Sequence, residues 1–191
     1  MDFTNSPLST VTLLSPNHSG PRNHAIDTVT VHCTQGQCTA RGIGEIFLPE
    51  ERRASSNYGI GYDGEIGLYV EERNRSWCSS SAENDHRAIT VEVSSDATAP
   101  YAVSDRAYEA LIALLCDICV RNGIDALRWR GDPALIGQVE KQNMTVHCWF
   151  KKKDCPGQYL YERHADIAAR VNARLAALHK NEREDGVCPI N

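Results

Sequence analysis

The sequence predicts an α/β domain with a central mixed β-sheet flanked by helices, and three observations carry that prediction. Segments 26–33 and 88–93 are rich in β-branched residues and place apolar and polar side chains alternately, as strands do. Segments 105–122 and 159–178 instead repeat apolar residues at the spacing of an amphipathic helix. Strands and helices occur in mixed order along the chain, which favours helices packed on a sheet.

A chain of 191 residues suits one domain. Its composition, 41% hydrophobic and 24% charged residues, is that of an ordinary globular protein, and no apolar run approaches the roughly 18 residues of a membrane-spanning helix. We therefore expect no membrane insertion. The net charge of -5 argues against a nucleic-acid binder, because phosphate neutralisation needs clustered Lys and Arg, and only Lys151 to Lys153 cluster here.

The two ends of the chain differ in composition from its middle. Residues 1–25 are rich in Pro, Asn, Ser and Gly and predict an N-terminal arm, residues 26–178 form the expected domain, and residues 179–191 form a polar C-terminal tail. The first residues lack the basic and apolar regions of a signal peptide, so we expect synthesis in the cytoplasm. The eight cysteines are then expected to stay reduced, with a metal role for one or a few.

Local patterns predict the elements of the first half of the domain. Segment 39–48, which follows the first strand, is expected to form a short helix. Segment 57–70 predicts a β-hairpin around an Asp-Gly turn, with Tyr58 among the large residues of one face and glycines on the other. Segment 76–86 is polar and turn-like. Strand 88–93 then carries Glu92 on the face opposite its isoleucine and valines.

The second half begins with the helix 105–122, which an Asn-Gly pair ends. Segment 127–130 is a candidate short strand, and an Asp-Pro pair starts a small helix over 132–139. A further strand is expected over 143–147. Helix 159–178 then closes the domain, packed against the sheet along its apolar stripe.

The tetrapeptide Thr-Val-His-Cys occurs twice, at residues 30–33 and 145–148. In a strand, each copy places its histidine on the face opposite the valine, so two strands present His32 and His147. Cys155 follows eight residues after His147, and a Pro-Gly pair ends the loop. Two imidazoles and one thiolate suit Zn2+, with a fourth position open for water. We expect this zinc site at one face of the sheet.

The cysteines that directly follow the two histidines have a different expected role. Side chains alternate along a strand, so Cys33 and Cys148 would point away from His32 and His147. We expect both to be packed core thiols.

This pattern, a histidine in a strand and a distant histidine followed by Cys-Pro-Gly, resembles the type-2 N-acetylmuramoyl-L-alanine amidases. That family includes phage endolysins and peptidoglycan recognition proteins, and the similarity extends from about Thr28 to Leu175. The resemblance places the third metal contact on Cys155, not on Asp154. It implies hydrolysis of the amide bond between N-acetylmuramic acid and L-alanine in bacterial peptidoglycan, by a phage or prophage endolysin that acts on the cell wall after release.

The resemblance also implies catalytic residues. Tyr58 matches a tyrosine that lies beside the metal in the family, and Lys153 matches a basic residue that stabilises the oxyanion. Glu92, a lone acid in a strand, could take a proton from water and pass it to the leaving amine, as a glutamate does in some members. A solvent-facing or supporting role for Glu92 is the alternative.

Segment 76–86 is expected to border the groove that binds the glycan and peptide. Its candidate substrate contacts are Trp77, Asn84 and His86, and the alternative is a plain surface loop.

Two other functions fit the same resemblance. One is an intracellular amidase that recycles soluble muropeptides, and the other is a non-catalytic peptidoglycan sensor. Sensors of this kind typically lack the cysteine ligand, so Cys155 favours an enzyme. The sequence leaves the oligomeric state open.

Overall fold

The computed structural model describes residues 3–185. Its helices, strands and 3-10 turns, in chain order, are β1 (Val11–Thr12), β2 (His18–Ser19), β3 (Thr28–Cys33), α1 (Ala40–Phe47), η1 (Glu50–Arg52), β4 (Tyr58–Ile60), β5 (Ile66–Leu68), β6 (Arg75–Ser76), α2 (Ala82–Arg87), β7 (Ala88–Val93), α3 (Asp105–Asn122), η2 (Pro133–Leu135), β8 (Met144–Thr145), η3 (His147–Trp149) and α4 (Gly157–Asp185).

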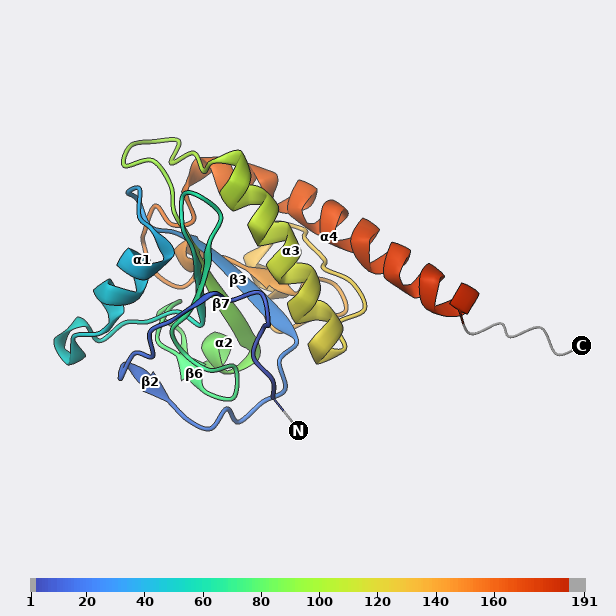
Figure 1. The fold of residues 1–191 in the computed structure, drawn as a ribbon, viewed down its shortest axis with the longest axis horizontal. Coiled ribbons are helices and arrows are strands. Elements are labelled where there is room, and N and C mark those ends of the chain that lie inside the picture. Colours follow the sequence, from blue (N-terminus) through green and yellow to red (C-terminus); the bar gives the residue numbers. More distant parts are fainter. Residues whose placement is uncertain (1–2, 186–191) are drawn as a thin grey trace, which may run out of the picture.

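The central element is a six-stranded sheet in the order β1-β5-β4-β7-β3-β8, and β2 and β6 form a separate two-stranded sheet. Only β4 and β5 pair antiparallel within the large sheet, while the other neighbours in it run parallel. Helices α3 and α4 lie side by side on one face (Figure 1). The structure thus confirms a mixed sheet flanked by helices.

The register of the central strands decides which side chains share a face. His32 of β3 lies opposite Glu92 of β7, which in turn lies opposite Gly59 of β4. Because paired residues point to the same side of a sheet, these three belong to one face. Val31 and Tyr58 lie one residue away in their strands and therefore point to the other face.

The face that carries Tyr58 holds the main core. Apolar side chains of α3 and α4 pack on it, among them Leu111, Ile118, Leu160 and Val171, all fully buried. Helix α1 covers part of the opposite face, where Ile43 and the neighbouring aromatic residues form a second, smaller cluster. The strands β7, β3 and β8 continue the sheet on the side away from β1, and the side chain of His32 in β3 points to this same face.

Most predicted elements are present, with shorter or longer bounds. Helix α1 begins after Thr39, whose Oγ1 accepts a hydrogen bond from Gly42 N, as expected of an N-cap. Helix α4 runs through Asp185, beyond the predicted end at residue 178. The polar segment 76–86, expected to be a loop, contains the short helix α2, capped by Ser81. Within residues 3–185, every helix is too short or too polar to span a membrane.

Three local predictions were wrong. Segment 127–130 is not a strand, because the backbone N–H of Arg128 bonds the side chain of Asn143 and not a neighbouring strand. The predicted helix 132–139 shrinks to the 3-10 turn η2. The last predicted strand stops at Thr145, because the chain turns into η3 at His147.

Residues 3–25 pack against the rest of the chain. Strand β1 pairs with β5 at the edge of the large sheet. The backbone N–H of Ser6 donates to the hydroxyl of Tyr58 at 2.7 Å, and that hydroxyl donates to Glu72 Oε1 at 2.6 Å. The division into arm, domain and tail stays a prediction.

This contact generates a stability prediction. Glu72 is fully buried and also accepts a hydrogen bond from Arg121 Nη2 at 2.5 Å. We expect Glu72→Gln to lower the free energy of unfolding by about 2 to 4 kcal/mol, because the largely buried guanidinium of Arg121 loses one of its two carboxylate partners and keeps only Asp117. Urea unfolding would measure the change. The control is Glu71→Gln, which removes an exposed ion pair with Arg73 and should cost less than about 1 kcal/mol. Equal losses in the two variants would contradict this account.

Candidate active site

Three side chains from distant parts of the sequence meet at one end of the sheet. His32 comes from β3, His147 from the start of η3, and Cys155 from the loop before α4, and their candidate ligand atoms all lie within 4.8 Å of one another. Cys155 Sγ is 3.2 Å from His32 Nδ1, and the two imidazole centroids are 5.1 Å apart. These are the three residues that the sequence predicted as metal ligands.

The repeated tetrapeptides explain how the two histidines become neighbours. Strands β3 and β8 run parallel with Thr30 opposite Thr145, so the two copies lie side by side in register. Their hydroxyls are 2.8 Å apart, and the side chain of Asn84 bonds both. The expectation that His147 sits in a strand was wrong, because β8 has ended and His147 opens a 3-10 turn.

The protonation of the cluster fits a cation. Burial and the neighbouring His147 lower the pKa of His32 to about 3, and burial and Lys153 lower the pKa of His147. Both rings are therefore neutral at pH 7, the form that binds a metal. A hydrogen bond with Cys33 and burial raise the pKa of the Cys155 thiol, so a thiolate here requires a positive charge beside it. The donor set of two nitrogens and one sulfur matches zinc.

The remaining cysteines near the cluster differ in burial. Cys33 is a free thiol buried in the core, as predicted, although it also contributes to the lining of the groove beside Cys155. Cys148 is partly exposed and not the core thiol that was expected, because η3 replaces the predicted strand. The backbone N–H of Cys148 donates to the carbonyl of Cys155 at 3.1 Å, which ties the two ligand segments together.

Glu92 lies beside the cluster, as the register of β3 and β7 requires. Its Oε1 is 4.0 Å from His32 Nδ1 and 3.9 Å from Cys78 Sγ, while Oε2 is buried and has no hydrogen-bond partner within residues 3–185. Burial raises the pKa of Glu92 to about 8. A carboxyl group with a pKa near neutrality can both accept and donate a proton.

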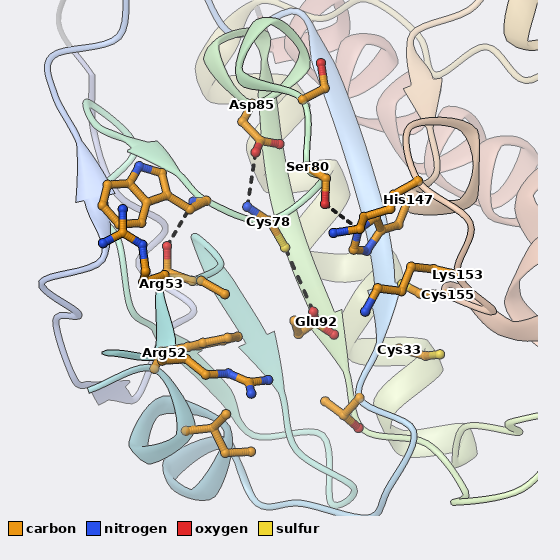
Figure 2. A pocket seen from close by; sticks show the side chains of 18 of the residues that line it. Cys33, Arg52, Arg53, Cys78, Ser80, Asp85, Glu92, His147, Lys153 and Cys155 are labelled. Carbon is orange, nitrogen blue, oxygen red and sulfur yellow. Dashed lines mark hydrogen bonds between the residues drawn. The ribbon is translucent and has the colours of Figure 1, made fainter. Parts of the chain in front are cut away.

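The cluster opens into a groove of about 840 Å³. His147, Cys155 and Glu92 line it, and Figure 2 shows Lys153 next to His147, with the two arginines that follow Glu51 on the far side. Among its lining residues are the cations Arg52, Arg53, Lys151 and Lys153. Among residues 3–180, whose side chains the structure describes, no carboxylate forms an ion pair with these four, and all four are exposed although the chain as a whole is acidic.

Tyr58 does not join this site. It was expected beside the metal, but the register places its side chain on the face opposite His32, where it is fully buried. Its hydroxyl is occupied by Ser6 and Glu72. The expected position of Tyr58 was therefore wrong, because side-chain alternation identifies residues that share a face but not which face carries the metal.

The three candidate substrate contacts of segment 76–86 have different positions. Trp77 lines the groove, with its indole N–H donating to Ser19 Oγ at 2.8 Å. Asn84 is buried and occupied by the two threonines, so it supports the ligand strands and does not face the groove. His86 lies outside the groove lining, and its Nδ1 accepts a hydrogen bond from Asn23 N.

Three contributions to the site were missed from the sequence. Ser80 Oγ lies 3.0 Å from His147 Nε2, and Cys78, with His32 and Glu92, forms a second group of possible metal ligands. Arg52 and Arg53 belong to a charged turn that gave no signal of its own. These residues belong to the site only because their loops lie close to the cluster in the folded chain, and a short sequence motif does not indicate which loops are close.

Comparisons with known proteins agree with this architecture. No curated protein matches the chain in sequence. Among solved structures, a selenomethionine derivative of AmpD is 19% identical with a TM-score of 0.62, and the match covers 88% of this chain and 99% of AmpD. PlyL is 14% identical with a TM-score of 0.63, and the match covers 90% of this chain and 97% of PlyL.

An endolysin N-acetylmuramoyl-L-alanine amidase, LysCS from Clostridium intestinale URNW, is 18% identical with a TM-score of 0.58. That match covers 85% of this chain and 94% of LysCS. At such identities the likeness shows a shared fold. The sequence model of N-acetylmuramoyl-L-alanine amidase, in contrast, matches residues 22–158, which is most of the chain, and the protein therefore belongs to the N-acetylmuramoyl-L-alanine amidase family.

Proposed function

We propose that this amidase is zinc-dependent and cleaves the bond between N-acetylmuramic acid and L-alanine in peptidoglycan. The observation that carries the proposal is the cluster of His32, His147 and Cys155, of which His147 and Cys155 line the groove. Two imidazole nitrogens and one thiolate favour zinc over harder cations such as magnesium. Three protein ligands leave one position open, which is typical of a catalytic zinc site.

The residues around the cluster divide the chemistry of amide hydrolysis among them. Bound zinc would polarise the scissile carbonyl and lower the pKa of water. A cation bound at the cluster would lower the pKa of the adjacent Glu92 carboxyl, so that Glu92 could accept the proton of the attacking water and return it to the departing amine. Lys153 lines the groove as an exposed cation and supplies positive charge for the developing oxyanion. Tyr58 has no part in this scheme, because it lies on the other face of the sheet.

The groove suits a charged polymer. Its lining includes four exposed cations, so it favours a substrate that carries carboxylates, as stem peptides do. Trp77 offers an aromatic surface within the same groove. We propose that these residues bind the stretch of peptidoglycan on either side of the scissile bond.

We further propose a lytic role, that of a phage or prophage endolysin. The shared fold with the endolysin LysCS supports this role. A non-catalytic sensor is disfavoured by Cys155, whose position beside both histidines completes a ligand set that binding alone does not need. An amidase that recycles soluble fragments would use the same chemistry. It would differ from an endolysin in its substrate, which is a soluble fragment and not the intact cell wall.

The metal proposal makes a first prediction. The purified protein should hold about one zinc per chain, and Cys155→Ser should weaken zinc binding and abolish hydrolysis, because a neutral hydroxyl replaces a thiolate. Metal analysis of the purified variants would show this. Cys38→Ser is the matched control, because Cys38 is a free, partly buried thiol outside the groove lining. A Cys155→Ser protein that retains its zinc and its turnover would contradict the assignment.

Lys153 provides a second prediction. Lys153→Ala should lower turnover by roughly 10- to 1,000-fold while zinc stays bound, the range expected for loss of a group that stabilises the oxyanion. The neighbouring Lys152 is exposed and does not line the groove, so Lys152→Ala should remain close to the unmodified protein. Steady-state kinetics with metal analysis of each variant would test both. Equal turnover in the two variants would remove Lys153 from the mechanism.

The reaction itself is tested by its products. Digestion of purified cell walls should release new N-terminal alanine without new reducing sugar ends, because an amide and not a glycosidic bond is cut. Amino-group and reducing-end assays on the same digest would measure both. New reducing ends would indicate a glycosidase, and wall binding without any released amine would leave the sensor. Turnover confined to soluble fragments would favour the recycling amidase over the endolysin.

A further inference from the structure

Ser80 makes a contact with the candidate metal cluster that the chemistry above does not use. Its Oγ lies 3.0 Å from Nε2 of His147, and Figure 2 shows this hydrogen bond beside the groove. Ser80 belongs to the segment between β6 and α2, far in sequence from all three candidate ligands. Because Nε2 is engaged by Ser80, Nδ1 is the nitrogen of His147 that remains for a metal.

The backbone at Ser80 is held in an unusual conformation. Its φ is 68°, in the left-handed region that residues other than glycine rarely adopt. The carboxylate of the buried Asp85 accepts hydrogen bonds from the backbone N–H groups of Cys78 and Ser79, both at 3.1 Å. On the other side, Ser81 caps α2 by accepting from Asn84 N. These bonds on both sides fix the turn and so fix the position of the Ser80 hydroxyl.

The two candidate histidine ligands are oriented in different ways. His32 is fully buried in β3, and packing fixes its ring, although its Nε2 has no hydrogen-bond partner within residues 3–185. His147 is partly exposed at the first position of a 3-10 turn, where packing restrains it less. Within residues 3–185, the ring of His147 forms a hydrogen bond with the Ser80 side chain, and it also lies edge-on against the ring of His32. Both contacts restrain the ring, and the hydrogen bond to Ser80 is the one that engages a ring nitrogen.

We propose that Ser80 is a positioning residue for His147. The Nε2–H of the neutral imidazole donates to Ser80 Oγ, which fixes the tautomer in which Nδ1 carries a lone pair directed at the metal. This proposal rests on the assignment of His147 as a zinc ligand. It adds a hydroxyl outside the ligand set as a determinant of zinc affinity.

The test is the zinc dissociation constant, measured by competition with a chromogenic chelator for the full-length protein. We expect Ser80→Ala and Ser80→Gly each to weaken zinc binding by about 10- to 100-fold, the effect of losing an outer partner of a ligand histidine. Ser80→Gly separates positioning from folding. Glycine adopts a positive φ without strain, so the thermal midpoint of the zinc-free Ser80→Gly variant should stay close to that of the zinc-free unmodified protein.

Ser81→Ala is the matched control. Ser81 lies in the same turn as Ser80, but its hydroxyl accepts a hydrogen bond from the first turn of α2 and makes no bond to His147. The thermal midpoint of Ser81→Ala should therefore fall, while its zinc affinity should stay the same. Unchanged zinc affinity in Ser80→Ala and Ser80→Gly, with zinc bound by the unmodified protein, would overturn the role of Ser80 alone. An unmodified protein that does not bind zinc would overturn the zinc assignment together with it.

Discussion

The parallel pairing of β3 with β7 and β8 is the constraint on which the candidate site depends. Pairing with β7 sets Glu92 opposite His32, and pairing with β8 aligns the second Thr-Val-His-Cys copy with the first. A shift by one residue would send His32 into the core that α3 and α4 cover. The buried bonds among Thr30, Thr145 and Asn84 hold this register where the ligands emerge.

Burial and charge act in opposite directions around the cluster. Burial keeps both imidazoles neutral and raises the pKa of Glu92, so the floor of the site carries little charge of its own at pH 7. The walls of the groove, in contrast, carry exposed cations in a chain of net charge -5. A cation in the floor would favour the Cys155 thiolate, and the walls would attract an anionic polymer.

The sequence was sufficient for the parts of the site that rest on short motifs. The repeated tetrapeptide and the Cys-Pro-Gly triplet identified all three residues of the cluster, and strand alternation placed Glu92 on the correct face. The sequence was not sufficient to predict side-chain positions that depend on how strands and loops pack together. Tyr58 and Asn84 had suitable chemistry but are committed to buried hydrogen bonds elsewhere, and Ser80 reaches His147 through a turn that no local pattern signals.

The central claim is that His32, His147 and Cys155 together hold one zinc ion. X-ray absorption spectroscopy of the zinc-loaded protein tests it most directly, because zinc–sulfur bonds are longer than zinc–nitrogen bonds. The account predicts one sulfur at about 2.3 Å, with the other ligands being nitrogen or oxygen at about 2.0 to 2.1 Å. A shell without sulfur would exclude Cys155. Two or more sulfurs would show that Cys33 or Cys78 binds the ion, and either result would contradict the assignment.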